Sequence, residues 1–184
     1  KPLWSVNALT DSGAAVPDWG FACSPLHHAG RIIVNPGGTN GKSLVAYDAE
    51  TGERIWSAGG APASYSSPMI ATLGWVEQVL SFNQPAITSH DPDTGAVLWE
   101  YPWGKGQPHV ALPVVVGEDT VMFSSGYGIG AELLRIQRDD AGKWSAERVW
   151  KSIRMKAKFA NLVRHGDFVY GLDDGILACI DLQD

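Results

Sequence analysis

Two stretches of the chain repeat one pattern. Residues 46–56 read Ala-Tyr-Asp-Ala-Glu-Thr-Gly-Glu-Arg-Ile-Trp, and residues 89–99 read Ser-His-Asp-Pro-Asp-Thr-Gly-Ala-Val-Leu-Trp. A small residue is followed by Asp, then by Thr-Gly, then by Trp at the same offsets in both. The equivalent positions are Asp48 and Asp91, Thr51 and Thr94, Gly52 and Gly95, and Trp56 and Trp99. Repetition of this kind predicts a fold built from repeated units.

The residue types in the pattern predict a tight turn followed by an anchored strand. An Asp carboxylate accepts hydrogen bonds from the backbone N–H groups of its own turn, and Thr does the same more weakly. Gly supplies the positive φ that such turns need. The Trp that follows then has a fixed place on the next strand, where burial of its ring removes roughly 150–250 Å² from water. This pattern predicts a structural role and no chemistry of its own.

Weaker copies of the pattern complete the chain. Asp139–Gly142 precedes Trp150, a further copy begins at Leu177–Asp181, and the opening Lys1-Pro-Leu-Trp4 reads like the end of another unit. The spacings between Trp4, Trp56, Trp99 and Trp150 are 52, 43 and 51 residues. A period of about 40–50 residues with several short strands in each unit is typical of a β-propeller blade.

Short β-rich segments separated by turns rich in Gly, Asp and Asn fill each unit, and no stretch reads as a helix. We therefore expect one all-β domain over residues 1–184, a β-propeller of about four four-stranded antiparallel blades. The repeats are expected at about residues 21–58, 64–101, 107–151 and 158–184, with Lys1–Val6 as an outer strand. Their innermost strands are expected at Cys23–His27, Ser67–Ala71, His109–Val116 and Ala160–Arg164.

Ala46–Trp56 resembles the tryptophan-docking motif of the PQQ-like, quinoprotein-type β-propeller repeats, and Ser89–Trp99 differs from it only at its first position. Residues 156–181 are similar to non-catalytic, BamB-like members of that family. The resemblance implies a ring of seven or eight blades, so we expect this chain to be part of a longer ring. A closed ring of four blades and a dimer that completes the ring are the alternatives.

The resemblance implies one of two functions. The first is a non-enzymatic scaffold of the bacterial cell envelope, periplasmic or secreted, that binds a protein or peptide through its loops and central channel without a cofactor. The alternative is an alcohol dehydrogenase-like quinoprotein that depends on PQQ and calcium. Quinoproteins of that type carry a disulfide between adjacent cysteines, whereas Cys23 and Cys179 lie far apart. We therefore favour the scaffold.

Composition excludes other classes of protein. The chain has 184 residues with 20 acidic and 14 basic side chains, and this net charge of −6 argues against nucleic-acid binding. Its 45% of hydrophobic and 18% of charged residues exclude intrinsic disorder. No apolar run approaches the roughly 18 residues that a membrane-spanning helix needs.

One group of residues is a candidate binding site. Arg154, Lys156 and Lys158 alternate, so in an extended segment they share one face, and this segment leads into the innermost strand of the fourth unit. His109 begins the innermost strand of the third unit. We expect these four residues to bind a partner or an anion at the rim of the channel. The sequence has no His-x-His and no Gly-x-Ser-x-Gly, and we predict neither metal ligands nor catalytic residues.

Overall fold

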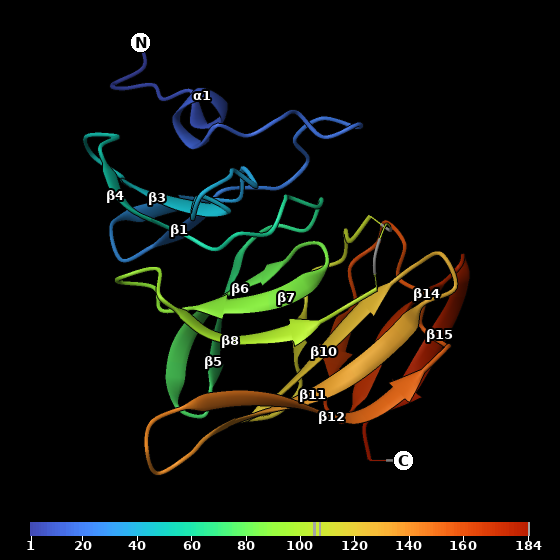
Figure 1. Cartoon of the computed structure of the whole chain (residues 1–184). Helices are drawn as coiled ribbons and strands as arrows, with labels where there is room; N and C mark the ends of the chain where they lie inside the picture. The colour runs from blue at the N-terminus through green and yellow to red at the C-terminus, as the bar shows by residue number, and fades with distance from the viewer. Residues whose placement is uncertain (105, 107, 184) are drawn as a thin grey trace.

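Four antiparallel sheets follow one another along the chain in the computed structural model, which describes residues 1–104, 106 and 108–183 (Figure 1). The first sheet contains β1 (Leu26–His28), β2 (Arg31–Val34), β3 (Leu44–Asp48) and β4 (Arg54–Ala58). The second contains β5 (Met69–Leu73), β6 (Val76–Phe82), β7 (Ala86–His90) and β8 (Val97–Pro102). The third contains β9 (Val114–Val115), β10 (Thr120–Ser125), β11 (Gly130–Arg138) and β12 (Trp144–Ser152). The fourth contains β13 (Val163–His165), β14 (Phe168–Asp173) and β15 (Ile176–Asp181).

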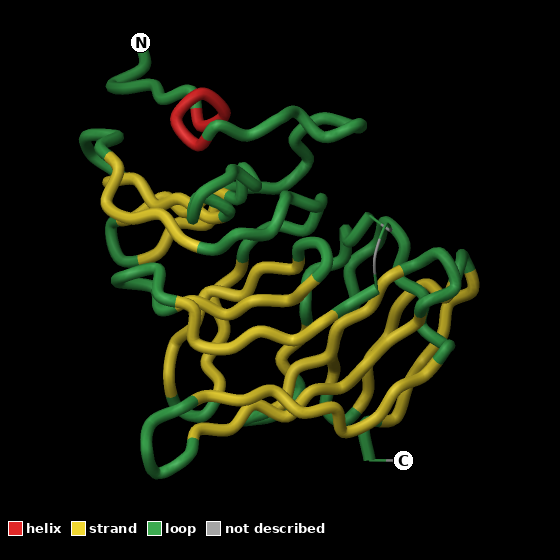
Figure 2. Tube along the Cα trace, in the orientation of Figure 1, coloured by secondary structure: helices red, strands yellow, loops and turns green. Residues whose placement is uncertain are grey.

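Each strand pairs only with its neighbours in sequence, which is the meander of a propeller blade, and we call the four sheets blades 1 to 4. Tight two-residue turns favour this pairing. In the turns Ala29–Gly30 and Gly74–Trp75, both residues have positive φ, as a type I′ hairpin requires. The all-β propeller architecture expected from the repeats is confirmed, with loops and strands alternating over almost the whole chain (Figure 2).

The hydrophobic core lies between the blades. Blades 1 and 2 enclose a cluster with Ile33 and Val79, blades 2 and 3 a larger one with Phe82 and Phe123, and blades 3 and 4 one that includes Met155. Blades 2 and 3 are therefore each covered on both faces, by one neighbouring blade on each side. Burial of these apolar side chains, at roughly 25 cal/mol per Å², is the main force that holds the blades together.

The innermost strands β1, β5, β9 and β13 all begin later than the sequence suggests, and all except β5 are also shorter than expected. The residues just before these strands bond to the next blade instead. Ser24 N donates to Ser67 Oγ at 2.8 Å, and Tyr65 N donates to the carbonyl of His109 at 2.9 Å. Leu112 N donates to Asn161 Oδ1 at 2.9 Å. These bonds tie the four inner segments to one another at the centre of the array.

Two further expectations need correction. A short helix, α1 (Ala8–Ser12), is present, capped by Asn7 and held on blade 1 by Asp11, which accepts from Tyr47 Oη at 2.9 Å and from Arg54 at 2.8 Å. Lys1–Val6 forms no strand. Blade 4, the sheet that lacks a fourth strand, receives none from this segment, and the described N- and C-terminal regions lie on opposite sides of the molecule (Figure 1).

The predicted repeats contain all the observed strands except the last residues of β8 and β12, Pro102 and Ser152. The predicted start of the third repeat, residue 107, and the predicted end of the fourth, residue 184, lie outside the described residues. No helix in the described part of the chain is long and apolar enough to cross a membrane.

Candidate functional site

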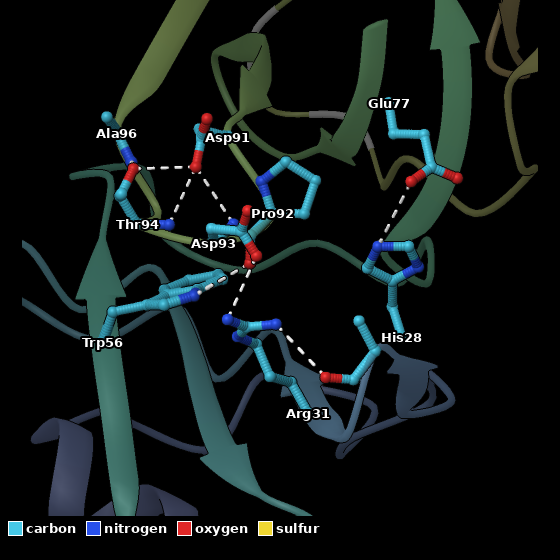
Figure 3. A network of polar contacts seen from close by, with 10 residues as sticks. His28, Arg31, Trp56, Glu77, Asp91, Pro92, Asp93, Thr94 and Ala96 are labelled. Carbon is cyan, nitrogen blue, oxygen red and sulfur yellow. Dashed lines mark hydrogen bonds and ion pairs between the residues drawn. The ribbon is translucent and has the colours of Figure 1, made fainter.

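The repeated turns join adjacent blades. In the turn of blade 2, Asp91 Oδ1 accepts from the N–H groups of Asp93 and Thr94 at 3.0 and 2.8 Å and from the Thr94 hydroxyl at 2.9 Å (Figure 3). Trp56 of blade 1 reaches this turn, where its Nε1 donates to the carbonyl of Pro92 at 3.1 Å. A Cβ on Gly95 would lie 2.6 Å from the Trp56 ring, so only glycine leaves room for the indole.

Blade 1 carries the same turn. Asp48 Oδ1 accepts from the backbone N–H and the hydroxyl of Thr51 at 2.8 and 3.0 Å. These hydrogen bonds, with one from the Glu50 N–H, lower the pKa of the Asp48 carboxyl. Trp4 donates from Nε1 to the carbonyl of Ala49 at 3.1 Å and lies against Gly52. Trp4 therefore occupies the position that Trp56 occupies one blade later, although no strand holds it.

The other two tryptophans of the pattern behave differently. Trp99 donates to Gln78 Oε1 at 2.8 Å, within its own blade, and not to the turn of blade 3. Blade 3 has a lengthened hairpin, whose Trp144 instead lies against Gly74 of blade 2. Trp150 is half-buried, and its Nε1 donates no hydrogen bond to the described residues.

Two contacts between a mostly buried basic side chain and an exposed acidic one border the turn of blade 2. Arg31 contacts Asp93 at 3.0 Å and also donates to the carbonyl of Ala29 at 3.2 Å, while His28 lies 3.6 Å from Glu77 (Figure 3). Because the carboxylate of each pair is exposed, solvent screens the attraction and the pair contributes little to stability. The turns and their borders therefore have an architectural role.

The four predicted binding residues are not gathered at one site. Lys156 Nζ bonds to the buried Asp173 and lies 3.6 Å from Asp174, and Arg154 lies 3.9 Å from Asp173. The hydrogen bond to Asp173 raises the pKa of Lys156, and the same bond lowers the pKa of Asp173. The charges of Arg154 and Lys156 are thus already paired.

Lys158 is placed differently. Its Nζ lies 4.4 Å from the centroid of the Tyr127 ring and 5.7 Å from that of Phe159, and it forms no ion pair with the described residues. A cation over aromatic faces is held by the ring quadrupoles while its charge stays available to a ligand.

His109 was expected at the channel rim, but it is wholly buried. Its ring stacks on Phe82, with centroids 4.4 Å apart and planes inclined by 13°, and Nδ1 lies 2.8 Å from the carbonyl of Asn83. Burial lowers its pKa to about 4. Since a ring with no exposed surface cannot reach a ligand, His109 serves the packing of blade 2 against blade 3.

An open cavity of about 510 Å³ lies where the inner segments of all four blades converge, and we call it the axial cavity. Its lining comes from each blade in turn: Ala22, Ser24, Pro25, Leu26, Tyr65, Ser67, Pro68, Met69, Ile70, Val110, Leu112, Phe159 and Asn161. The tryptophan repeat does not predict this cavity, but a second repeated feature of the sequence, a Ser-Pro pair, marks two of the segments that line it. Ser24-Pro25 and Ser67-Pro68 recur at the same place before the first strand of their blades.

The lining of the axial cavity contains no carboxylate and no histidine. Among the described residues, no three side chains of His, Cys, Asp or Glu are grouped so that they could hold a metal ion. Calcium takes six to eight oxygen ligands, several of them carboxylates. The described residues of the cavity therefore do not fit a calcium-bound quinone.

Comparison with known proteins agrees with this architecture. The structure of BamB from Moraxella catarrhalis matches 89% of this chain with a TM-score of 0.59 and 17% sequence identity, and the chain spans about half (50%) of that structure. The designed Ika8 protein matches over 85% of this chain and 57% of its own, with a TM-score of 0.42 and 11% identity. No curated protein matches the chain. A family model described as outer membrane protein assembly factor BamB matches residues 1–184, and the chain therefore belongs to this family of PQQ-like repeat proteins.

Proposed function

We propose that this chain belongs to a protein-binding scaffold of the bacterial cell envelope, and that it engages its partner through the axial cavity and the loops around it. The observation that carries the proposal is the construction of the cavity. Inner segments from four blades, tied together by hydrogen bonds, form an open hollow on a rigid frame. Rigid frames that present open hollows lined by both apolar and hydrogen-bonding groups are typical of binding sites.

Membership of the family supports this proposal. The family is described by an outer membrane assembly factor, and a factor of that kind acts by contact with other proteins. The same description supports a place in the cell envelope, and we propose that the protein is periplasmic or secreted. The partner is expected to be a protein or peptide, since the net charge of −6 does not suit nucleic acid.

The alternative function, a PQQ- and calcium-dependent dehydrogenase, makes an opposite prediction. A quinoprotein binds one PQQ together with calcium, and a scaffold binds neither. The described lining of the axial cavity supports the scaffold, because its side chains are apolar, hydroxyl and amide groups and include no carboxylate to hold the ion.

Two measurements on the purified chain test the proposal. The first is native mass spectrometry with and without PQQ and Ca²⁺, which also reports whether the chain forms a dimer. The second is selection from a random peptide display library, followed by binding assays against the chain and its Phe159→Ala variant. We expect no mass shift from PQQ with calcium, and selected peptides that lose affinity for the variant. A calcium-dependent mass shift of one PQQ would contradict the scaffold, as would peptides that bind both proteins equally.

A further inference from the structure

Aromatic side chains form the wall of one end of the axial cavity. Trp19, Tyr65 and Phe159, together with Ala22 and Val110, enclose an almost wholly apolar hollow of about 350 Å³. Trp19 is 65% exposed and Phe159 is 64% exposed. The rings of Trp19 and Tyr65 lie 5.3 Å apart and are inclined by 41°, so they form a tilted wall and not a flat platform. A cluster of exposed rings around a hollow is typical of a site that receives an apolar group.

The polar groups beside this hollow have hydrogens to donate. The oxygens of Tyr65, Ser67 and Asn161 already accept hydrogen bonds from the backbone N–H groups of Trp19, Ser24 and Leu112. The hydroxyl hydrogens of Tyr65 and Ser67 and the amide hydrogens of Asn161 are donated to no described residue. An occupant that offers acceptors, as peptide carbonyls and carboxylates do, can therefore bind these groups in place of water.

A lysine lines the neighbouring cavity, which shares Phe159 with the aromatic hollow. Lys158 lies over the rings of Tyr127 and Phe159, and no described carboxylate pairs with it. Asp174 also lines that neighbouring cavity, but it pairs with Lys156, as the buried Asp173 does. Among the described residues, Lys158 is thus a cation that has no carboxylate partner and lies next to Phe159, and its charge is complementary to that of an anion.

We propose that the aromatic hollow receives a short acidic segment of the partner protein that carries one large aromatic side chain next to a carboxylate. This inference rests on the proposed function and names the chemistry of its ligand. The aromatic side chain enters between Trp19, Tyr65 and Phe159. The peptide carbonyls accept from Ser67 and Asn161, and the carboxylate lies at Lys158.

Four fluorescein-labelled peptides with identical Gly-Ser flanks test this proposal by fluorescence anisotropy on the full chain. Their central residues are Glu-Phe-Glu, Glu-Ala-Glu, Gln-Phe-Gln and Lys-Phe-Lys. We expect Glu-Phe-Glu to bind most tightly and to lose about tenfold in affinity when either Phe or the acidic pair is replaced. Raising the salt concentration is expected to weaken Glu-Phe-Glu more than Gln-Phe-Gln.

Reversing the charge of Lys158 tests its role most directly. Lys158→Glu is expected to shift the preference from Glu-Phe-Glu toward Lys-Phe-Lys, whereas Lys143→Glu, the same change on an exposed residue of the distant β11–β12 turn, is expected to shift nothing. Phe159→Ala is expected to cost about tenfold in affinity, and Leu177→Ala, at a residue that is 75% exposed on β15, to cost nothing. If Phe159→Ala does not fold by circular dichroism, Phe159→Leu replaces it, with a smaller loss expected.

Each outcome separates this inference from the proposed function. If the chain binds the acidic, neutral and basic peptides equally well, or if Lys158→Glu leaves its preference unchanged, the proposal of an acidic ligand is wrong. If display selection yields peptides that depend on Phe159 but are basic or lack aromatic residues, the scaffold stands and this inference fails. If neither selected nor designed peptides depend on Phe159, both fail.

Discussion

Trp56 and Gly95 meet across the boundary between blades 1 and 2, where a Cβ on the glycine would come within 2.6 Å of the indole ring. Gly95 also has a φ of 76°, which disfavours any side chain. The contact therefore requires glycine for two reasons, backbone conformation and space. It couples the stability of one blade to the turn of the next.

Replacement of this glycine separates the two reasons. We expect Gly95→Ala to lower the free energy of unfolding by about 2–4 kcal/mol, from strain at positive φ plus overpacking against Trp56. Gly30→Ala, at φ 75° with no atom near its Cβ, is expected to cost about 1 kcal/mol. Gly60→Ala, with neither constraint, is the control and is expected to cost almost nothing. Urea denaturation measures all three, and equal losses in Gly95→Ala and Gly30→Ala would show that the Trp56 contact is unimportant.

The Asp91 carboxylate organises the same turn. Burial favours its neutral form, but hydrogen bonds from Thr94 outweigh this and lower the pKa of Asp91 below its ordinary value. A lowered pKa in the folded state stabilises the protein above the unfolded pKa of about 4, and this stability is lost as the pH falls through the folded pKa. We expect Asp91→Asn to keep most of the turn and to weaken the acid dependence of stability below about pH 4, as followed by thermal unfolding. Asp91→Ala is expected to lose about 1–2 kcal/mol at pH 7. If Asp91→Asn loses stability at low pH as steeply as the wild type does, other carboxylates cause that loss.

His109 predicts a second pH window. Its folded pKa of about 4 lies below the ordinary value of 6.5, so the folded protein binds fewer protons than the unfolded chain between these values. Stability is therefore expected to fall from pH 6.5 toward pH 4. In the His109→Gln variant this slope should decrease by about 1.4 kcal/mol per pH unit at most. His27→Gln, at an exposed residue, should leave the slope as it is in the wild type. A His109→Gln slope equal to that of the wild type would mean that this ring does not titrate as its burial requires.

Asp11 anchors α1 on blade 1 through Tyr47 and Arg54. We expect Asp11→Ala to increase hydrogen exchange in residues 8–13 and to lower the free energy of unfolding by about 1–2 kcal/mol. Asp18→Ala, at an exposed residue of the following loop, serves as the matched control. Unchanged protection of residues 8–13 in Asp11→Ala would show that other contacts hold the helix.

Local signals explain how much of this fold is predictable from sequence. The turns at Asp48 and Asp91 depend on residues within five positions, so the repeat and the all-β blades could be inferred directly. The late start of the innermost strands could not, because Ser24 and Leu112 bond to other blades, not to their own sheets. Local propensity carries no information about such contacts between segments about 45 residues apart.

The candidate site is harder to predict for the same reason. Trp19, Tyr65 and Phe159 come from separate parts of the chain, and none lies in a recognisable motif. The basic triplet was visible in the sequence, yet the pairing of Lys156 with Asp173 depends on a strand that follows it. Lys158 lies over the rings of Tyr127 and Phe159, whereas Arg154 and Lys156 pair with Asp173. The sequence alone does not show which of the three residues lies over the rings.

Methyl NMR of the chain, titrated with the Glu-Phe-Glu peptide, tests most directly whether the axial cavity is the binding surface. We predict that the largest shift changes occur at Met69, Ile70, Val110 and Leu112, which line that cavity. Val6, Leu9 and Val34 line a separate cavity beside α1 and are predicted to remain unchanged. Shift changes confined to these three residues, or no change in the axial cavity at saturating peptide, would contradict its role as the binding surface.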